Sequence, residues 1–258
     1  MRWGLAGSAA ARFAVASGKI VGILFLIAAV GSGALYLVEP WLESRGLRKV
    51  DPQLSTLPLS LPNHDRAILS GRALDCYGFR LLLPRKEIVT TYKSDSMTLV
   101  LFRNGALEIP NTSRHYGIFE FLNREKQARA LLRPETLQSK FKLMQAAMLA
   151  TPEQVKWWRL RSSSNERIDN LLLTKLYALT EGGSGVTGGV PIYTIAYGEF
   201  RGFQFGSPGV APYDAHLDLF DGTDRYFALS VTATGHGQVL TQEEINAVAA
   251  SIQSASAR

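Results

Sequence analysis

The chain has 258 residues, of which 46% are hydrophobic and 19% charged, a composition typical of a globular protein and not of a disordered one. Its single cysteine, Cys76, excludes an internal disulfide and a multi-cysteine zinc site, and we expect it to be a small buried hydrophobic residue. The net charge of +6 is unevenly placed, because residues 124–175 carry eleven Lys and Arg against five acids, whereas residues 176–258 carry three against eight.

This charge asymmetry indicates what the chain contacts. We expect the basic segment 124–175 to face an anionic surface or another envelope protein. Nucleic acid is not expected as a partner, because no nucleic-acid-binding motif accompanies the charge.

Residues 20–38 (IVGILFLIAAVGSGALYLV) are uncharged, and this length is close to the roughly 20 residues that a helix needs to cross a bilayer. We therefore predict a short basic tail over 1–19 and a transmembrane helix over 20–38 that contacts the lipid bilayer. A cleaved signal peptide is the alternative, because the small residues 31–34 suit a peptidase. The apolar stretch is longer than the core of about 7 to 15 residues that such peptides have.

Three basic residues precede this stretch, and three directly follow it, namely Arg45, Arg48 and Lys49, so the count of flanking charges leaves the orientation open. Lys19 directly adjoins the stretch, whereas the next basic residue, Arg45, stands seven positions beyond its end. This favours a single-pass signal anchor in the cell membrane, with a cytoplasmic N-terminus and a periplasmic or extracellular domain.

Residues 39–66 are predicted to be a juxtamembrane segment and linker, because three prolines between 50 and 64 favour an extended spacer. A single globular domain is predicted over 67–258. Its first part reads as strands, with short apolar runs at 79–83, 97–102 and 116–121. Asn104-Gly105 predicts a two-residue hairpin turn after the second run.

The middle of the domain has helical patterns. Asn123 is expected to cap one helix and Pro134 to open the next, whose apolar stripe is Leu137, Phe141, Met144 and Met148. The capping-box patterns at 151–154 and 163–166 predict two further helix starts, and Gly182-Gly183 is expected to end the second of these helices.

The last part returns to strands, predicted as antiparallel at 192–197, 200–205, 215–220 and 225–232, before a final helix that opens with a capping box at Thr241. The fold class predicted from this order is α+β, an antiparallel sheet packed with helices in a sandwich-like arrangement, preceded by one transmembrane helix.

The sharpest group of candidate ligands is Asp214, His216 and Asp218. Residues two apart on a strand share a face, so these three side chains form a candidate metal site. The competing interpretation is an ordinary strand with one face in solvent. If the apolar residues of this strand lie opposite Phe227 and Leu229, the numbers of two paired residues must have an even sum. An even sum requires a loop of odd length around Asp221-Gly222, which predicts a bulged turn.

One further segment, Lys156–Arg161 (KWWRLR), interleaves cations and tryptophans. Such a segment contacts anionic lipid, or it buries one tryptophan in the core and leaves its cations in solvent.

The sequence contains no nucleophile elbow, no paired-histidine zinc motif and no phosphate-binding loop. We therefore favour a non-enzymatic interaction or accessory module on the membrane, and expect no cofactor. Two alternatives stay open. One is a metal-dependent hydrolase using Asp214, His216 and Asp218, and the other is a carrier of an apolar ligand held beside the aromatic strands at 192–205.

Overall fold

The computed structural model describes residues 52–61, 71–112, 138–156, 162–181, 190–209, 214–234 and 238–254, together with residue 158 and separate helical positions between 38 and 49. Apart from Val38, the predicted membrane segment lies outside these residues, as do the predicted strand at 116–121 and the helix starts at Asn123 and Pro134. No helix within the described ranges is long and apolar enough to span a membrane.

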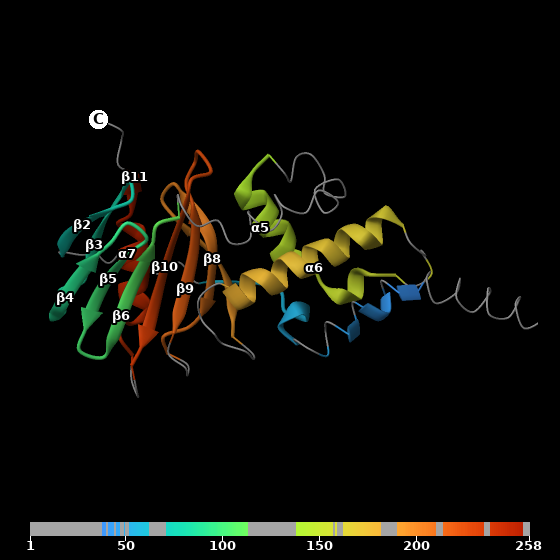
Figure 1. The fold of residues 1–258 in the computed structure, drawn as a ribbon, viewed down its shortest axis with the longest axis horizontal. Coiled ribbons are helices and arrows are strands. Elements are labelled where there is room, and N and C mark those ends of the chain that lie inside the picture. The colour runs from blue at the N-terminus through green and yellow to red at the C-terminus, as the bar shows by residue number, and fades with distance from the viewer. Residues whose placement is uncertain are drawn as a thin grey trace, which may run out of the picture.

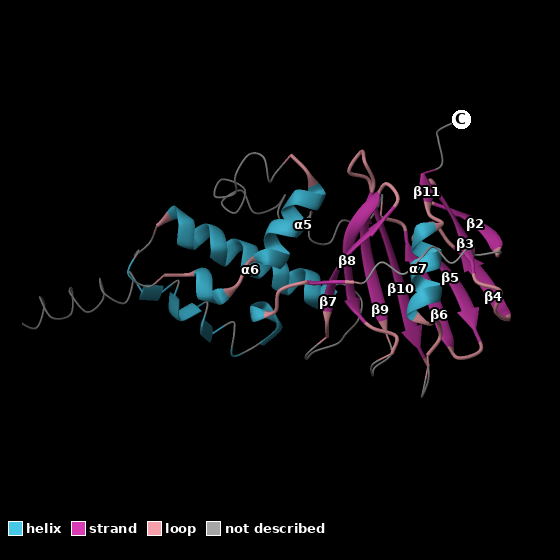
Figure 2. Ribbon diagram, turned by 180° about the vertical axis from the view of Figure 1, so that it is seen from behind, coloured by secondary structure: helices cyan, strands magenta, loops and turns pink. Residues whose placement is uncertain are grey.

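The described elements follow the order strands, helices, strands and a last helix, which is an α+β arrangement (Figure 2). The elements are, in chain order, the 3-10 helix η1 (Pro52–Ser55), β1 (Leu59–Ser60), β2 (Arg72–Cys76), β3 (Phe79–Leu83), β4 (Ile88–Lys93), β5 (Met97–Phe102), β6 (Gly105–Pro110), α5 (Lys140–Leu149), the 3-10 helix η2 (Pro152–Gln154), α6 (Ser163–Glu181), β7 (Ile192–Tyr197), β8 (Phe200–Gly206), β9 (Ala215–Phe220), β10 (Tyr226–Ala233), α7 (Gln242–Ala250) and β11 (Gln253–Ser254).

Eight strands form one large sheet in the order β1-β7-β8-β9-β10-β6-β5-β4, and β11-β3-β2 form a small one. The large sheet is mixed and not wholly antiparallel as predicted, because β1 runs parallel to β7. This parallel strand comes from the segment predicted to be a linker, and Leu54 just before it is fully buried. Residues 52–61 are therefore held against the domain.

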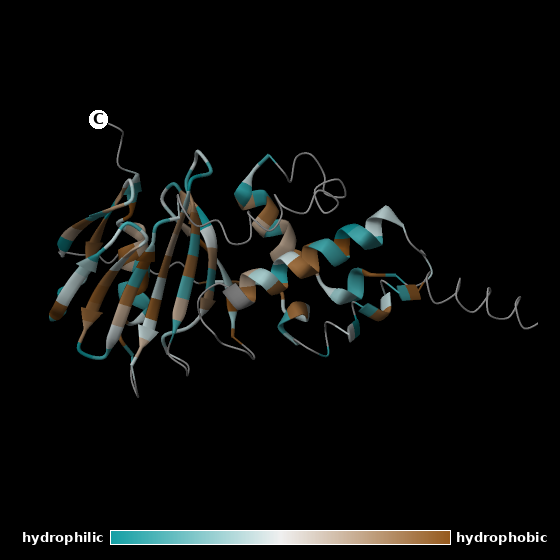
Figure 3. Ribbon diagram, viewed as in Figure 1, coloured by the Kyte–Doolittle hydropathy of each residue, from teal (hydrophilic) through white to brown (hydrophobic). Residues whose placement is uncertain are grey.

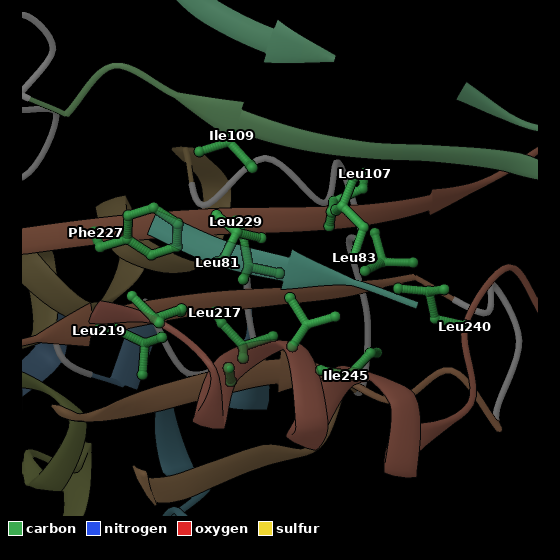
Figure 4. Close-up of a cluster of buried hydrophobic side chains, with 14 of the residues drawn as sticks. Leu81, Leu83, Leu107, Ile109, Leu217, Leu219, Phe227, Leu229, Leu240 and Ile245 are labelled. Atoms are coloured by element: carbon green, nitrogen blue, oxygen red, sulfur yellow. The ribbon is translucent and has the colours of Figure 1, made fainter. Parts of the chain in front are cut away.

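Two hydrophobic cores lie on opposite faces of the large sheet. The first lies between the large sheet, the small sheet and α7, and includes Leu107, Leu217 and Leu229 (Figure 4). The second lies where α5 and α6 cover β7, β8 and β9, and includes Phe203 and Phe220. Because successive residues of a strand point to opposite faces, β9 contributes to both cores.

Local caps set the helix starts, and one helix begins later than predicted. Ser139 caps α5 and accepts a hydrogen bond from the amide of Lys142, so this helix does not continue from Pro134 as predicted. The box at Thr151 opens only a 3-10 turn. The box at Thr241 forms both of its hydrogen bonds and opens α7 as predicted.

The predicted hairpin of β5 and β6 is present, but its loop is one residue earlier than expected. Phe102 pairs with Gly105, so the loop residues are Arg103 and Asn104, and neither has a positive φ. Gly105 is needed for another reason, since a Cβ there would lie 2.2 Å from the carbonyl oxygen of Thr232 on β10.

Candidate functional site

The candidate site lies on β9, and the interpretation that this strand has one face in solvent is wrong. All six residues of β9 are buried, with His216 only 6% and Asp218 only 3% exposed. The physical reason is its central place in the sheet, where one core packs on each face.

Two of the three predicted ligands come together. The Nε2 atom of His216 lies 3.0 Å from Oδ1 of Asp218, and its Nδ1 atom lies 2.7 Å from the hydroxyl oxygen of Ser230. The hydroxyl of Tyr226 donates to the same oxygen of Asp218. Asp214 is directed elsewhere, because its Oδ1 atom accepts from the amide of Ala233 at 2.8 Å. Among the described residues, no three His, Cys, Asp or Glu side chains gather as a metal site.

The contact with Asp218 places a proton on Nε2 of His216, because a carboxylate only accepts hydrogen bonds. In the neutral ring, Nδ1 then accepts from the hydroxyl of Ser230. Burial, together with the charge of Asp218 and the hydrogen bond to it, raises the pKa of Tyr226 well above its ordinary value. Tyr226 therefore stays a donor.

Ser230 and Tyr226 were not predicted as site residues, although the sequence contains the signal for one of them. The even-sum register between the two strands is confirmed, with Leu217 opposite Leu229, and the same register places His216 opposite Ser230. The odd-length loop is confirmed as well. A turn closed by the bond from the amide of Asp224 to the carbonyl of Asp221 precedes Arg225, and Asp224 has a φ of 64°.

The two remaining aspartates of this hairpin have structural roles. Asp221 accepts from Thr223, Arg225 and Ser254. Burial alone would raise the pKa of Asp221, but these hydrogen bonds outweigh it and hold that pKa well below its usual value. Asp224 reaches across to the first turn of α5, where its carboxylate accepts from the amides of Lys140 and Phe141.

The cluster of His216, Asp218 and Ser230 lies where two parts of one sheet face meet. On the side of β7 to β9, and at the start of β10 where Tyr226 packs against the second core, the face is covered by α5 and α6. The rest of β10 together with β6, β5 and β4 presents the same face without a described helix over it (Figure 1). We call this part the open half. Ser230 is half-buried and pairs with Glu108, which is the neighbouring polar residue on this face.

The open half is apolar at its centre. Met97, Leu99 and Leu101 are half-buried and alternate with the core residues of β5, which Figure 3 shows as an apolar strand. Tyr92 is opposite Leu99 and is 60% exposed. None of these four side chains belongs to either hydrophobic core formed by the described residues.

One cation of the basic segment 124–175 is not at the surface, and residues 124–137 of this segment lie outside the described residues. Lys175 is fully buried, and its Nζ atom donates to the carbonyl oxygens of Leu54, Thr56 and Ala150 at 3.1, 2.7 and 3.1 Å. Within the segment KWWRLR, Trp158 is 60% exposed, with the Nζ atom of Lys156 at 5.7 Å from the centre of its ring.

The aromatic strands β7 and β8, the predicted place of an apolar ligand, are packed by side chains from the helices. The ring of Phe141 from α5 lies 6.3 Å from that of Phe203 and 5.9 Å from that of Phe220, between ring centres.

In comparisons with protein-family models, curated proteins and solved structures, the chain has no significant match.

Proposed function

We propose that this chain is a single-pass membrane protein whose extracytoplasmic domain binds another envelope protein through the open half of its sheet. The observation that carries the proposal is the set of apolar side chains there, Met97, Leu99, Leu101 and Tyr92, which belong to neither core that the described residues form. Apolar surface that stays outside a core and is rimmed by polar residues is typical of a protein interaction site.

The size of this surface indicates the occupant. Four strands about 4.8 Å apart and six residues long at about 3.4 Å each give a face of about 19 by 20 Å, or about 400 Å². This is half of the roughly 800 Å² that each partner contributes to a standard interface, and it fits one amphipathic helix. Glu108 lies among the apolar residues, so the matching helix carries a Lys or Arg between its apolar residues.

The direct test is to isolate the full-length chain from its own membranes in mild detergent and identify co-purifying proteins by mass spectrometry. A photo-crosslinking amino acid at Tyr92 should then form an adduct with the same partner. The matched control is Glu199, which is exposed in the turn between β7 and β8 and should give no such adduct.

Two results would contradict the proposal. One is a Tyr92 crosslink that stays within the chain, because the face is then covered by the protein itself. The other is unchanged partner recovery with Leu99→Lys and Leu101→Lys variants that retain the native thermal midpoint.

A second candidate function is acyl transfer, which the contacts of His216 favour. In this reaction the hydroxyl oxygen of Ser230 attacks an ester carbonyl while its proton passes to Nδ1 of His216, and Asp218 stabilises the imidazolium. The proton then passes to the leaving alcohol as the ester bond breaks, and water releases the acyl group in the same way.

Acyl transfer ranks second because of the place of Ser230 in the sheet. Ser230 is in the middle of β10, and β10 is hydrogen-bonded to a strand on each side. The backbone amide of Ser230 is therefore not free to stabilise an oxyanion. Labelling of Ser230 by a fluorophosphonate, lost in His216→Gln, would establish this reaction. The metal-dependent hydrolase has less support, because Asp214 bonds to the backbone at Ala233.

A further inference from the structure

Two pairs of a tryptophan and a cation lie on different segments of the chain. The guanidinium of Arg45 is 4.5 Å from the ring centre of Trp41, and Lys156 is placed in the same way over Trp158 at 5.7 Å. Trp158 is 60% exposed, and Leu42 beside Trp41 is 48% exposed. Exposed aromatics next to cations are typical of a membrane–water interface.

Both pairs lie at the same end of the part of the domain that α5 and α6 build, which we call the helical half. The backbone of Lys156 exchanges hydrogen bonds of 3.3 and 2.8 Å with the side chain of Asn165, in the first turn of α6. Trp41 packs against the core that α5 and α6 build. Burial, and then the charge of Glu43, raises the pKa of Asp169 to about 7, which places Glu43 near the second turn of α6.

This end is the one farthest from the sheet, as Figure 1 shows for the first residues of α6 and the segments between 38 and 49. The apolar stretch 20–38 ends three residues before Trp41. At about 1.5 Å per helical residue this is about 4.5 Å, which keeps Trp41 within the headgroup layer of any bilayer that the stretch spans.

We propose that this end of the helical half rests on the bilayer surface, with Trp41 and Trp158 among the lipid headgroups and Arg45 and Lys156 beside their phosphates. The inference rests on the membrane anchor of the proposed function and adds the orientation of the domain. The helical half is then proximal to the membrane, and the open half of the sheet is held away from it, accessible to a partner.

The test uses the full chain in vesicles of phosphatidylcholine and phosphatidylglycerol that contain a lipid with a nitroxide on its headgroup. A bimane fluorophore is attached at Ser163→Cys, at the start of α6, or at Thr91→Cys on β4, both of which are exposed. Cys76 does not compete for the label, because it is buried. We expect quenching at residue 163 to be several-fold stronger than at residue 91.

A double variant, Trp158→Ser with Lys156→Ser, should reduce the quenching at residue 163 by at least half. The matched control is Val89→Ser, since Val89 is 64% exposed, close to the 60% of Trp158, but lies on β4 of the sheet, and it should change nothing. Equal quenching at the two labels would overturn the proposal, as would a double variant that quenches like the native chain.

Failure of this inference is distinguishable from failure of the proposed function. Flotation of the chain with the vesicles after carbonate treatment tests the anchor, and crosslinking at Tyr92 tests the partner. A chain that floats but shows equal quenching overturns only the surface contact of the helical half. A chain that does not float overturns both.

Discussion

Replacing Lys175 with methionine should destabilise the domain and release residues 54–61 from it. The ammonium of Lys175 is fully buried on α6 and donates to carbonyl oxygens of Leu54, Thr56 and Ala150. It thereby joins residues 54–56, the end of α5 and α6. Methionine has a similar length but no donor, so it leaves these carbonyl groups without the ammonium.

The size of the effect follows from these three contacts. A hydrogen bond from a charged donor contributes about 1.5 to 3 kcal/mol, so three contribute about 5 to 9 kcal/mol. Removing the buried charge offsets several kcal/mol of this, because burying an ammonium has a desolvation cost of that order. We expect a net loss of about 2 to 4 kcal/mol. With a slope of about 2 kcal/mol per molar urea, the midpoint should fall by about 1 to 2 M.

The assay is urea unfolding of the full-length chain in mild detergent, followed by alkylation of Cys76, whose buried thiol becomes accessible on unfolding. Hydrogen exchange should show lost protection at residues 54–61 before the rest of the domain opens. Lys142→Met is the matched control, because Lys142 is exposed on α5 and should shift stability by less than about 0.5 kcal/mol. An unchanged midpoint together with full protection of residues 54–61 would refute the reasoning.

Three further predictions concern single groups. Asp224→Gly keeps the positive φ of 64° but removes the acceptor for the first amides of α5, and should cost about 1 to 2 kcal/mol in urea unfolding, with Asp224→Asn costing less. Burial raises the pKa of Cys76 to about 11, so iodoacetamide should label it near pH 8 only as fast as the domain unfolds. Burial, then Glu43 and Glu166, raises the pKa of Asp169 from 3.8 to about 7, so its ionisation disfavours the folded state increasingly between these pH values. Asp169→Asn should therefore stabilise the domain above about pH 7 and have little effect near pH 4, as measured by thermal melting.

Each of these expectations has a specific contrary result. A Gly variant at 224 as stable as the native chain would show that the α5 amides find other acceptors. Alkylation of Cys76 far faster than unfolding would show a local opening of β2. A stability gain for Asp169→Asn that is the same at both pH values would show that the charge of the carboxylate is not its cause.

Most of the local elements can be predicted from the sequence. The strands at 79–83, 97–102, 192–197 and 215–220 and the capping box of α7 were predicted with their observed positions, because alternation and capping depend only on neighbouring residues. The even-sum register of β9 and β10 also followed from the sequence, since each of these strands alternates apolar and polar residues near the hairpin.

Tertiary structure decided the burial of polar groups and the site. The exposure of Asp218 and His216 depends on α5 and α6 folding over β9 from distant parts of the chain, and alternation along one strand carries no information about that cover. In the same way, the partners of Lys175 are up to 121 residues away, so nothing next to Lys175 predicts that its ammonium holds the supposed linker on the domain. Local patterns specify which residues share a face, and only the packing of remote elements specifies which of those faces water can reach.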